Sequence, residues 1–73
     1  MAANAQGRYD EAIESLKRLI QQDPRNYRLY IEVANTCMLK GEKKEAIEIL
    51  EEFRKLGIRN TEVNERLEKL RNQ

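Results

Sequence analysis

Residues 7–16 read GRYDEAIESL, and residues 41–50 read GEKKEAIEIL. The two stretches lie 34 residues apart, and Gly, Glu, Ala, Ile, Glu and Leu recur at this offset without a gap. The dipeptide Arg-Asn recurs at the same offset, at residues 25–26 and 59–60. A period kept over so many positions indicates a duplicated structural unit, because two unrelated amphipathic helices would not share it.

Apolar residues recur at spacings of three and four in four segments, which is the pattern of amphipathic helices. The expected helices are Arg8–Gln22, Arg28–Lys40, Glu42–Leu56 and Thr61–Asn72. Links of only a few residues make each helix fold back against the one before it. No alternating strand pattern competes with these helices. The sequence therefore predicts an all-α fold, a row of antiparallel helical hairpins of the α-solenoid kind.

Turn residues mark the ends of the expected helices. Pro24 stops the first helix, because proline lacks an amide hydrogen and disfavours helical geometry in the residue before it. Gly41 and Gly57 can take the left-handed conformation that ends the second and third helices. Asn60 or Thr61 is expected to cap the start of the fourth.

The charge balance argues against several classes of partner. In 73 residues, 14 Lys and Arg face 13 Asp and Glu, a formal net charge of +1. This balance provides no field for nucleic acid or an anionic membrane surface. No apolar run approaches the length of a membrane span, so membrane insertion is not expected. We expect a protein or peptide partner.

The side-chain inventory argues against catalysis. There is no His and one Cys, which excludes the usual zinc ligand sets, and no glycine-rich phosphate loop is present. We therefore expect no catalytic residue, metal or cofactor, and no enzyme. Cys37 cannot form an internal disulfide, which fits a cytoplasmic location. Cys37 is read as a small buried hydrophobe, with a reactive thiol as the alternative.

The 34-residue period of helix, turn and helix resembles the tetratricopeptide repeat family. The complete unit, residues 27–60, carries the matching pattern at Tyr30, Val33, Ala34, Cys37, Ala46, Leu50 and Phe53. Residues 1–26 resemble a truncated first unit that is mainly its second helix, and residues 61–73 resemble a C-terminal capping helix. Ala34 and Ala46 are small where the two helices of a hairpin cross, and larger side chains fill the space around them.

The truncation leads to a further expectation. Only Ala2–Gln6 would remain of the first helix of the first unit, so the chain is read as a piece of a longer array. The flank of the following helix, including Ile13, Leu16 and Ile20, would then lack part of its cover. A homo-oligomer could supply that cover. The alternative function is thus a structural or engineered minimal repeat that mainly self-associates and has no ligand of its own.

The resemblance implies a concave groove, lined by the first helix of each unit, that receives a peptide or a helix. The residues chosen for this groove are Arg28, Ile31, Asn35, Met38, Leu39 and Arg66. Other matching positions are Glu32, Glu62, Glu65 and Lys69. Ile31, Asn35 and Met38 form a second stripe, apart from the core stripe of the same helix. The alternative is that this stripe simply packs on the adjacent helices.

Two narrower interpretations are less favoured. Some family members clamp a C-terminal carboxylate, but Ile31 stands where the clamp Lys belongs, and Glu32 and Glu62 would repel an anionic tail. The charge-rich segments could be patches that a partner recognises. They are instead read as solvated helix faces with i,i+4 pairs such as Glu51–Lys55. The predicted function is a scaffold or adaptor that binds a peptide or helix in the groove.

Overall fold

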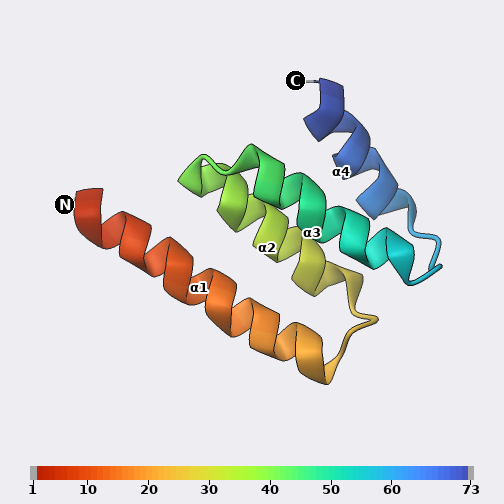
Figure 1. Cartoon of the computed structure of the whole chain (residues 1–73), viewed down its shortest axis with the longest axis horizontal. Coiled ribbons are helices and arrows are strands. Elements are labelled where there is room, and N and C mark those ends of the chain that lie inside the picture. Colours follow the sequence, from red (N-terminus) through yellow and green to blue (C-terminus); the bar gives the residue numbers. More distant parts are fainter. Residues whose placement is uncertain (1, 73) are drawn as a thin grey trace.

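A computed structural model describes the backbone of residues 2–72 and the side chains of residues 7–72. The chain forms four helices, α1 (Ala2–Gln22), α2 (Tyr27–Lys40), α3 (Lys43–Lys55) and α4 (Thr61–Asn72). α1 lies against α2, α2 against α3, and α3 against α4, so that helices follow one another in space as they do in sequence (Figure 1). The all-α prediction and all four helical segments are confirmed.

The first helix is longer than predicted. α1 begins at Ala2, and the structure places Ala2–Gln6 in one continuous helix with Arg8–Gln22. The reading of Ala2–Gln6 as a remnant of a preceding helix is therefore wrong. Gly7 does not break α1, because a glycine inside a helix costs only about 1 kcal/mol relative to alanine and this one keeps an ordinary backbone angle.

Gly41 makes the sharp turn from α2 to α3. Its φ angle is 91°, in the left-handed region that other residues avoid. The Gly41 amide donates to the Met38 carbonyl, and the Glu42 amide donates to the Cys37 carbonyl at 2.7 Å. These two bonds satisfy carbonyl groups at the end of α2 and let α3 start at Lys43. The hairpin at the centre of the fold therefore depends on this glycine.

Two asparagines start the helices that open each unit. The Asn26 side-chain oxygen accepts a hydrogen bond from the Arg28 amide at 3.2 Å. The Asn60 oxygen accepts one from the Val63 amide at 3.0 Å. Each bond satisfies an amide that the first turn of a helix leaves without a partner. The recurrence of Asn at an offset of 34 residues is thus explained by capping, and the predicted cap of α4 is Asn60.

The core lies between α2 and α3 and extends under α1 and α4. Its buried members are Ile13, Tyr30, Ile31, Val33, Ala34, Cys37, Ala46, Ile49, Leu50, Phe53, Val63, Leu67 and Leu70. The Tyr30 and Phe53 rings meet edge to face, with their centroids 5.1 Å apart. The buried Tyr30 hydroxyl donates to the Pro24 carbonyl at 2.8 Å. Tyr30 therefore fills the core at one end and holds the α1–α2 loop at the other.

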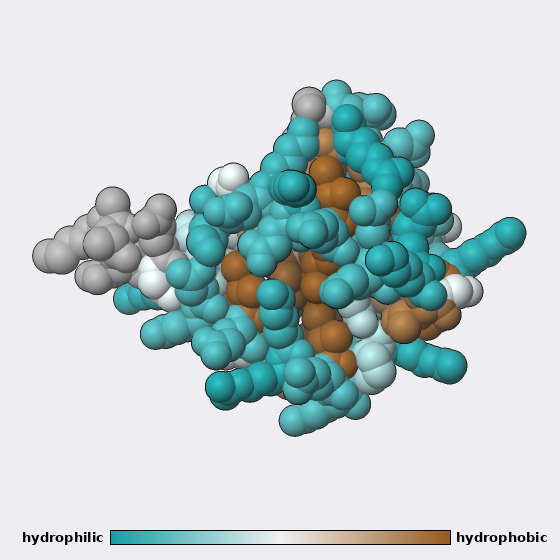
Figure 2. All heavy atoms as spheres, viewed as in Figure 1, coloured by the Kyte–Doolittle hydropathy of each residue, from teal (hydrophilic) through white to brown (hydrophobic). Residues whose placement is uncertain are grey.

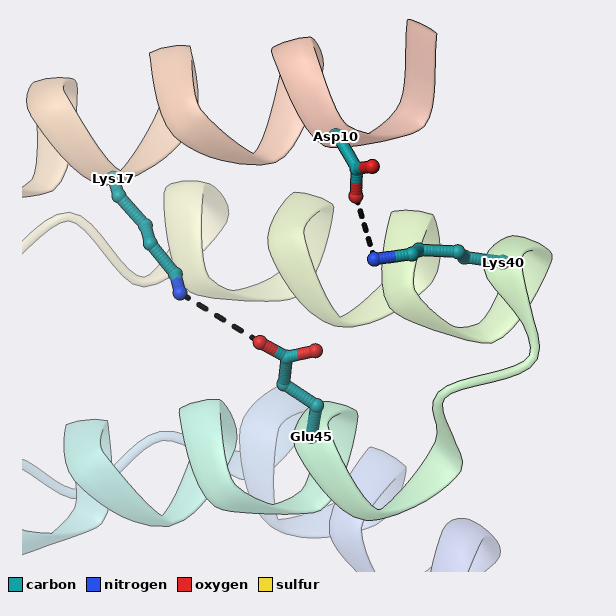
Figure 3. Close-up of polar contacts among 4 residues, drawn as sticks. All are labelled: Asp10, Lys17, Lys40 and Glu45. Atoms are coloured by element: carbon teal, nitrogen blue, oxygen red, sulfur yellow. Dashed lines mark ion pairs between the residues drawn. The ribbon is translucent and has the colours of Figure 1, made fainter. Parts of the chain in front are cut away.

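Ion pairs join helices that are not all neighbours in sequence. Lys40 of α2 pairs with Asp10 of α1 at 2.5 Å, and Lys17 of α1 reaches Glu45 of α3 at 3.7 Å (Figure 3). These side chains are partly solvated, so solvent screening keeps the contribution of each pair to stability small. They connect α1 to both helices of the α2–α3 hairpin.

A third pair corrects a prediction. Glu51 pairs with Arg71 of α4, so the expected partner Lys55 on its own helix is wrong. α4 runs back beside α3 at an angle (Figure 1), and this brings Arg71, 20 residues away in the sequence, into contact with Glu51. The contact joins α4 to α3 on the rim of the core.

Replacing Gly41 by alanine tests the role of the turn. We expect Gly41→Ala to lower the free energy of unfolding by about 1 kcal/mol, because alanine is strained at a positive φ. Gly7→Ala is the matched control and should raise it by up to about 1 kcal/mol, since an added methyl group meets nothing within 4 Å. Urea unfolding followed by circular dichroism measures both values. A loss of stability in both variants, or in neither, would contradict this account of the two glycines.

Candidate functional site

A small hollow lies between α2 and α4, the two helices that open successive units. Its volume is about 150 Å³. The lining residues are Ala34, Asn35, Met38, Leu50, Arg66, Lys69 and Leu70. Core side chains form the floor, while an amide and two cations stand at the rim. The structure thus brings together three of the predicted groove residues, Asn35, Met38 and Arg66.

A hydrogen bond ties the two sides of this hollow together. Arg66 of α4 donates from Nη1 to the side-chain oxygen of Asn35 on α2 at 2.7 Å. The acceptor of Asn35 is therefore engaged within the chain, and its amide nitrogen is the group left to donate to a partner. Because a charged donor strengthens a hydrogen bond, Arg66 also holds Asn35 in one orientation at the rim.

The other predicted residues differ in exposure. Ile31 is only 5% exposed and packs in the core, so its surface available to a partner is small. Leu39 is 69% exposed, the most exposed of the large apolar side chains among residues 7–72. Met38 is partly buried against the core. The second stripe of α2 is therefore divided, since Ile31 packs inward, Met38 is partly buried and Asn35 faces solvent.

Arg28 marks the far end of the α2–α4 surface. A hydrogen bond with the Tyr27 side chain raises the pKa of its guanidinium, and the Glu62 carboxylate of α4 adds a smaller effect in the same direction. An arginine and a glutamate at this end offset each other's charge. The positive charge of Lys69 and Arg66 at the hollow has no such carboxylate among the described residues that line it.

Sequence reasoning assigned Ala34, Leu50 and Leu70 to the core and did not connect them with the site. All three are buried, yet each also contributes to the floor of the hollow. A sequence signal was present for Lys69, because it lies three residues from Arg66 and thus on the same face of α4. Nothing in the sequence indicates that a buried core side chain also lines a surface hollow.

Two larger hollows lie beside α1. One, of about 460 Å³, lies between α1 and α2 and is lined by Ala12, Ser15, Leu16, Glu32, Asn35 and Thr36. The other, of about 470 Å³, is lined by Lys17, Ile20, Gln21, Val33, Glu45, Glu48, Ile49 and Glu52. In Figure 2 apolar residues show through a surface that is otherwise mostly hydrophilic. Both hollows are broad and shallow surfaces.

The chemistry available to the described residues is limited. Cys37 is fully buried, and burial raises the pKa of its thiol, with a further increase from the Glu45 carboxylate. A thiol with a raised pKa is a poor nucleophile. Among residues 7–72, no cluster of three or more His, Cys, Asp or Glu side chains is placed to hold a metal ion. Within residues 2–72, no helix has both the length and the apolar character needed to cross a bilayer.

Comparisons with known proteins agree with this architecture. A family model described as Tetratricopeptide repeat matches residues 3–55, which include nearly all of α1 and the whole of α2 and α3. Comparison with curated proteins and with solved structures gives no match.

The buried thiol predicts a pH dependence of stability. In the unfolded chain Cys37 ionises near pH 8.5, whereas folding raises its pKa, so the folded state holds the proton more tightly. The contribution of the protonated Cys37 thiol to the free energy of unfolding is fully present below about pH 8.5. It is lost as the pH rises, and the free energy of unfolding then falls by up to about 1.4 kcal/mol per pH unit. We expect the free energy of unfolding to fall between about pH 8.5 and 9.5, and to fall less in Cys37→Ala. Equal slopes in both proteins, from urea unfolding, would show that Cys37 is not the source.

Proposed function

The chain belongs to the tetratricopeptide repeat family, and on that premise we propose that it is a binding module that receives a peptide or a helix on the surface between α2 and α4. Tetratricopeptide repeats generally mediate protein–protein interaction. The observation that supports this surface is the hollow where Asn35, Met38 and Arg66 meet. Catalysis has no part in the proposal.

The size of the hollow argues for one side chain as the group received. Sites for cofactors and small metabolites usually enclose about 300–1,000 Å³. A volume of about 150 Å³ is well below that range, and a single apolar side chain fits it better. Met38 at the wall favours this occupant, because its flexible thioether adapts to different apolar shapes. A peptide would therefore insert one aliphatic or methionine side chain between the two helices.

The rim adds a charge preference. Arg66 and Lys69 lie on α4 beside the hollow, and the described residues that line it include no carboxylate to offset them. The Asn35 amide can donate to a peptide carbonyl next to the anchor. These groups favour a peptide in which the apolar anchor is flanked by Asp or Glu, since opposite charges across an interface increase both association rate and specificity.

The preference is local to the hollow. Glu62 lies near Arg28 at the other end of α4, and the whole chain has a net charge of only +1. A long acidic partner would be attracted by the cations at the hollow but repelled by Glu62 at this end of α4. The expected ligand is accordingly short and mixed in character, with its acidic group beside the anchor.

A displayed library of random peptides, selected against the immobilised full chain, tests this proposal. We expect selected sequences to carry Leu, Ile or Met next to Asp or Glu, and synthetic copies to bind in fluorescence anisotropy. Asn35→Ala and Lys69→Glu should each weaken binding by about tenfold, or about 1.4 kcal/mol, through the lost hydrogen bond or the reversed charge. Lys44→Glu makes the same charge change on the exposed side of α3 and should leave affinity unchanged. Selected peptides that bind all these proteins equally would place the binding surface elsewhere.

A further inference from the structure

A strip of apolar side chains on α1 is uncovered where the repeat predicts cover. In the complete unit, three residues of α3 are buried under α2; they are Ala46, Leu50 and Phe53. The residues 34 positions earlier are Ala12, Leu16 and Leu19 of α1. Ala12 is exposed, Leu16 is only partly buried, and Leu19 is 46% exposed. The side chains at these repeat positions are thus covered by a neighbouring helix on α3 but are left largely uncovered on α1.

The uncovered strip continues onto α2. Thr36 lines the same hollow as Ala12, Ser15 and Leu16, and Leu39 lies one turn further along α2. We call these six residues the α1–α2 face; they are Ala12, Ser15, Leu16, Leu19, Thr36 and Leu39. No member of this face carries a charge. Two of its members are among the three large apolar residues that are notably exposed among residues 7–72.

The last helix of another copy does not suit this face. If α4 covered α1 as α2 covers α3, its contacting residues would be those that match Tyr30, Ala34 and Cys37 at an offset of 34. These residues are Asn64, Glu68 and Arg71, and all three are exposed and polar. Burying the two charged ones against Leu16 and Leu19 would cost several kcal/mol. Head-to-tail stacking of copies into an open filament is therefore disfavoured.

Charges at the two ends of the face complement each other under a two-fold rotation. Arg8 lies one turn before Ala12 on the same side of α1, and Glu32 lines the hollow from α2. The Asp10–Lys40 ion pair shows that residue 10 of α1 lies opposite residue 40 of α2. Because the two helices are antiparallel, moving eight residues back along α2 to Glu32 corresponds to moving eight residues forward along α1. Glu32 therefore lies opposite residue 18 of α1. Along α1, residue 13 is midway between Arg8 and residue 18, which is the position opposite Glu32. A two-fold axis there would place Arg8 of one copy beside Glu32 of the other.

We propose that the α1–α2 face is covered by the same face of a second copy, with the two α1 helices crossing antiparallel. The axis at residue 13 places Ala12 and Ser15 at the crossing, where small side chains allow close approach. Leu16, Leu19 and Leu39 of each copy then cover the apolar strip of the other. Arg8 and Glu32 form an ion pair at each end. This interface is closed, because both copies use the same surface.

Sedimentation equilibrium of the full chain over about a hundredfold range of concentration tests the dimer, because association follows mass action. We expect the average mass to rise from one chain to two. Leu19→Glu should abolish the rise, since it places a charge within the apolar strip. Leu56→Glu is the matched control, because Leu56 is 47% exposed on the end of α3, outside this face, and it should dimerise normally. Circular dichroism checks that both variants keep their helix content.

Charge reversal tests the orientation. Arg8→Glu and Glu32→Arg should each weaken dimerisation by about tenfold, and the double variant should restore it, because the ion pair is rebuilt with its charges exchanged. Lys69→Glu should leave dimerisation unchanged, which separates this inference from the peptide surface between α2 and α4. A monomer at all concentrations, equal loss in Leu19→Glu and Leu56→Glu, or a double variant no better than the single ones would overturn the proposal.

Discussion

The packing of α2 on α3 is the contact on which the rest of the structure depends. Ala34 and Ala46 are both buried in this hairpin, where small residues let two helices approach closely. Leu50 and Phe53 are almost completely buried around them, and Tyr30 meets Phe53 edge to face. α1 and α4 each pack on this hairpin from the side. If the hairpin opened, neither outer helix would retain an apolar surface large enough to hold it.

The same contact determines where binding surfaces arise. α2 packs on α1 and on α3 (Figure 1), and its residues Asn35 and Met38 line the hollow shared with α4. Asn35 lies where two of these boundaries meet, because it lines both the α2–α4 hollow and the α1–α2 hollow. The two surfaces proposed for a peptide and for a second copy are therefore neighbours on one helix. A ligand bound on either surface would border the other surface at Asn35.

Much of the fold could be predicted from the sequence because the repeat and the turn residues are local signals. Gly41 ends α2 and Asn60 caps α4 as expected, since these effects need only a few adjacent residues. The start of α1 was mispredicted because Ala2–Gln6 were taken as the remnant of a separate helix, whereas they continue α1. The Glu51 partner was mispredicted because it depends on how α4 crosses α3, and that angle is not encoded in helical spacing.

The candidate site was less predictable for a similar reason. Helical spacing places Ile31 with Asn35 and Met38, yet Ile31 is buried and Asn35 is exposed. Where each boundary between core and surface falls on α2 depends on the positions of α1 and α4. The contact between Asn35 and Arg66 spans 31 residues and is likewise a result of tertiary packing. Local pattern therefore indicated the helix that carries the candidate site, while packing decides which of its residues are accessible.

The thinness of the fold explains why surfaces, and no enclosed cavity, carry the proposed functions. The molecule measures 40 × 31 × 14 Å, so its shortest dimension accommodates about two layers of helices at the usual spacing of about 8–10 Å between axes. Two layers can bury a shared seam but cannot surround a ligand on all sides. Affinity must then come from side chains inserted between helices and from charges at the rim. Such a design exposes several helix faces at once, and a face left uncovered by the described residues, such as the α1–α2 face, is a place where another chain can bind.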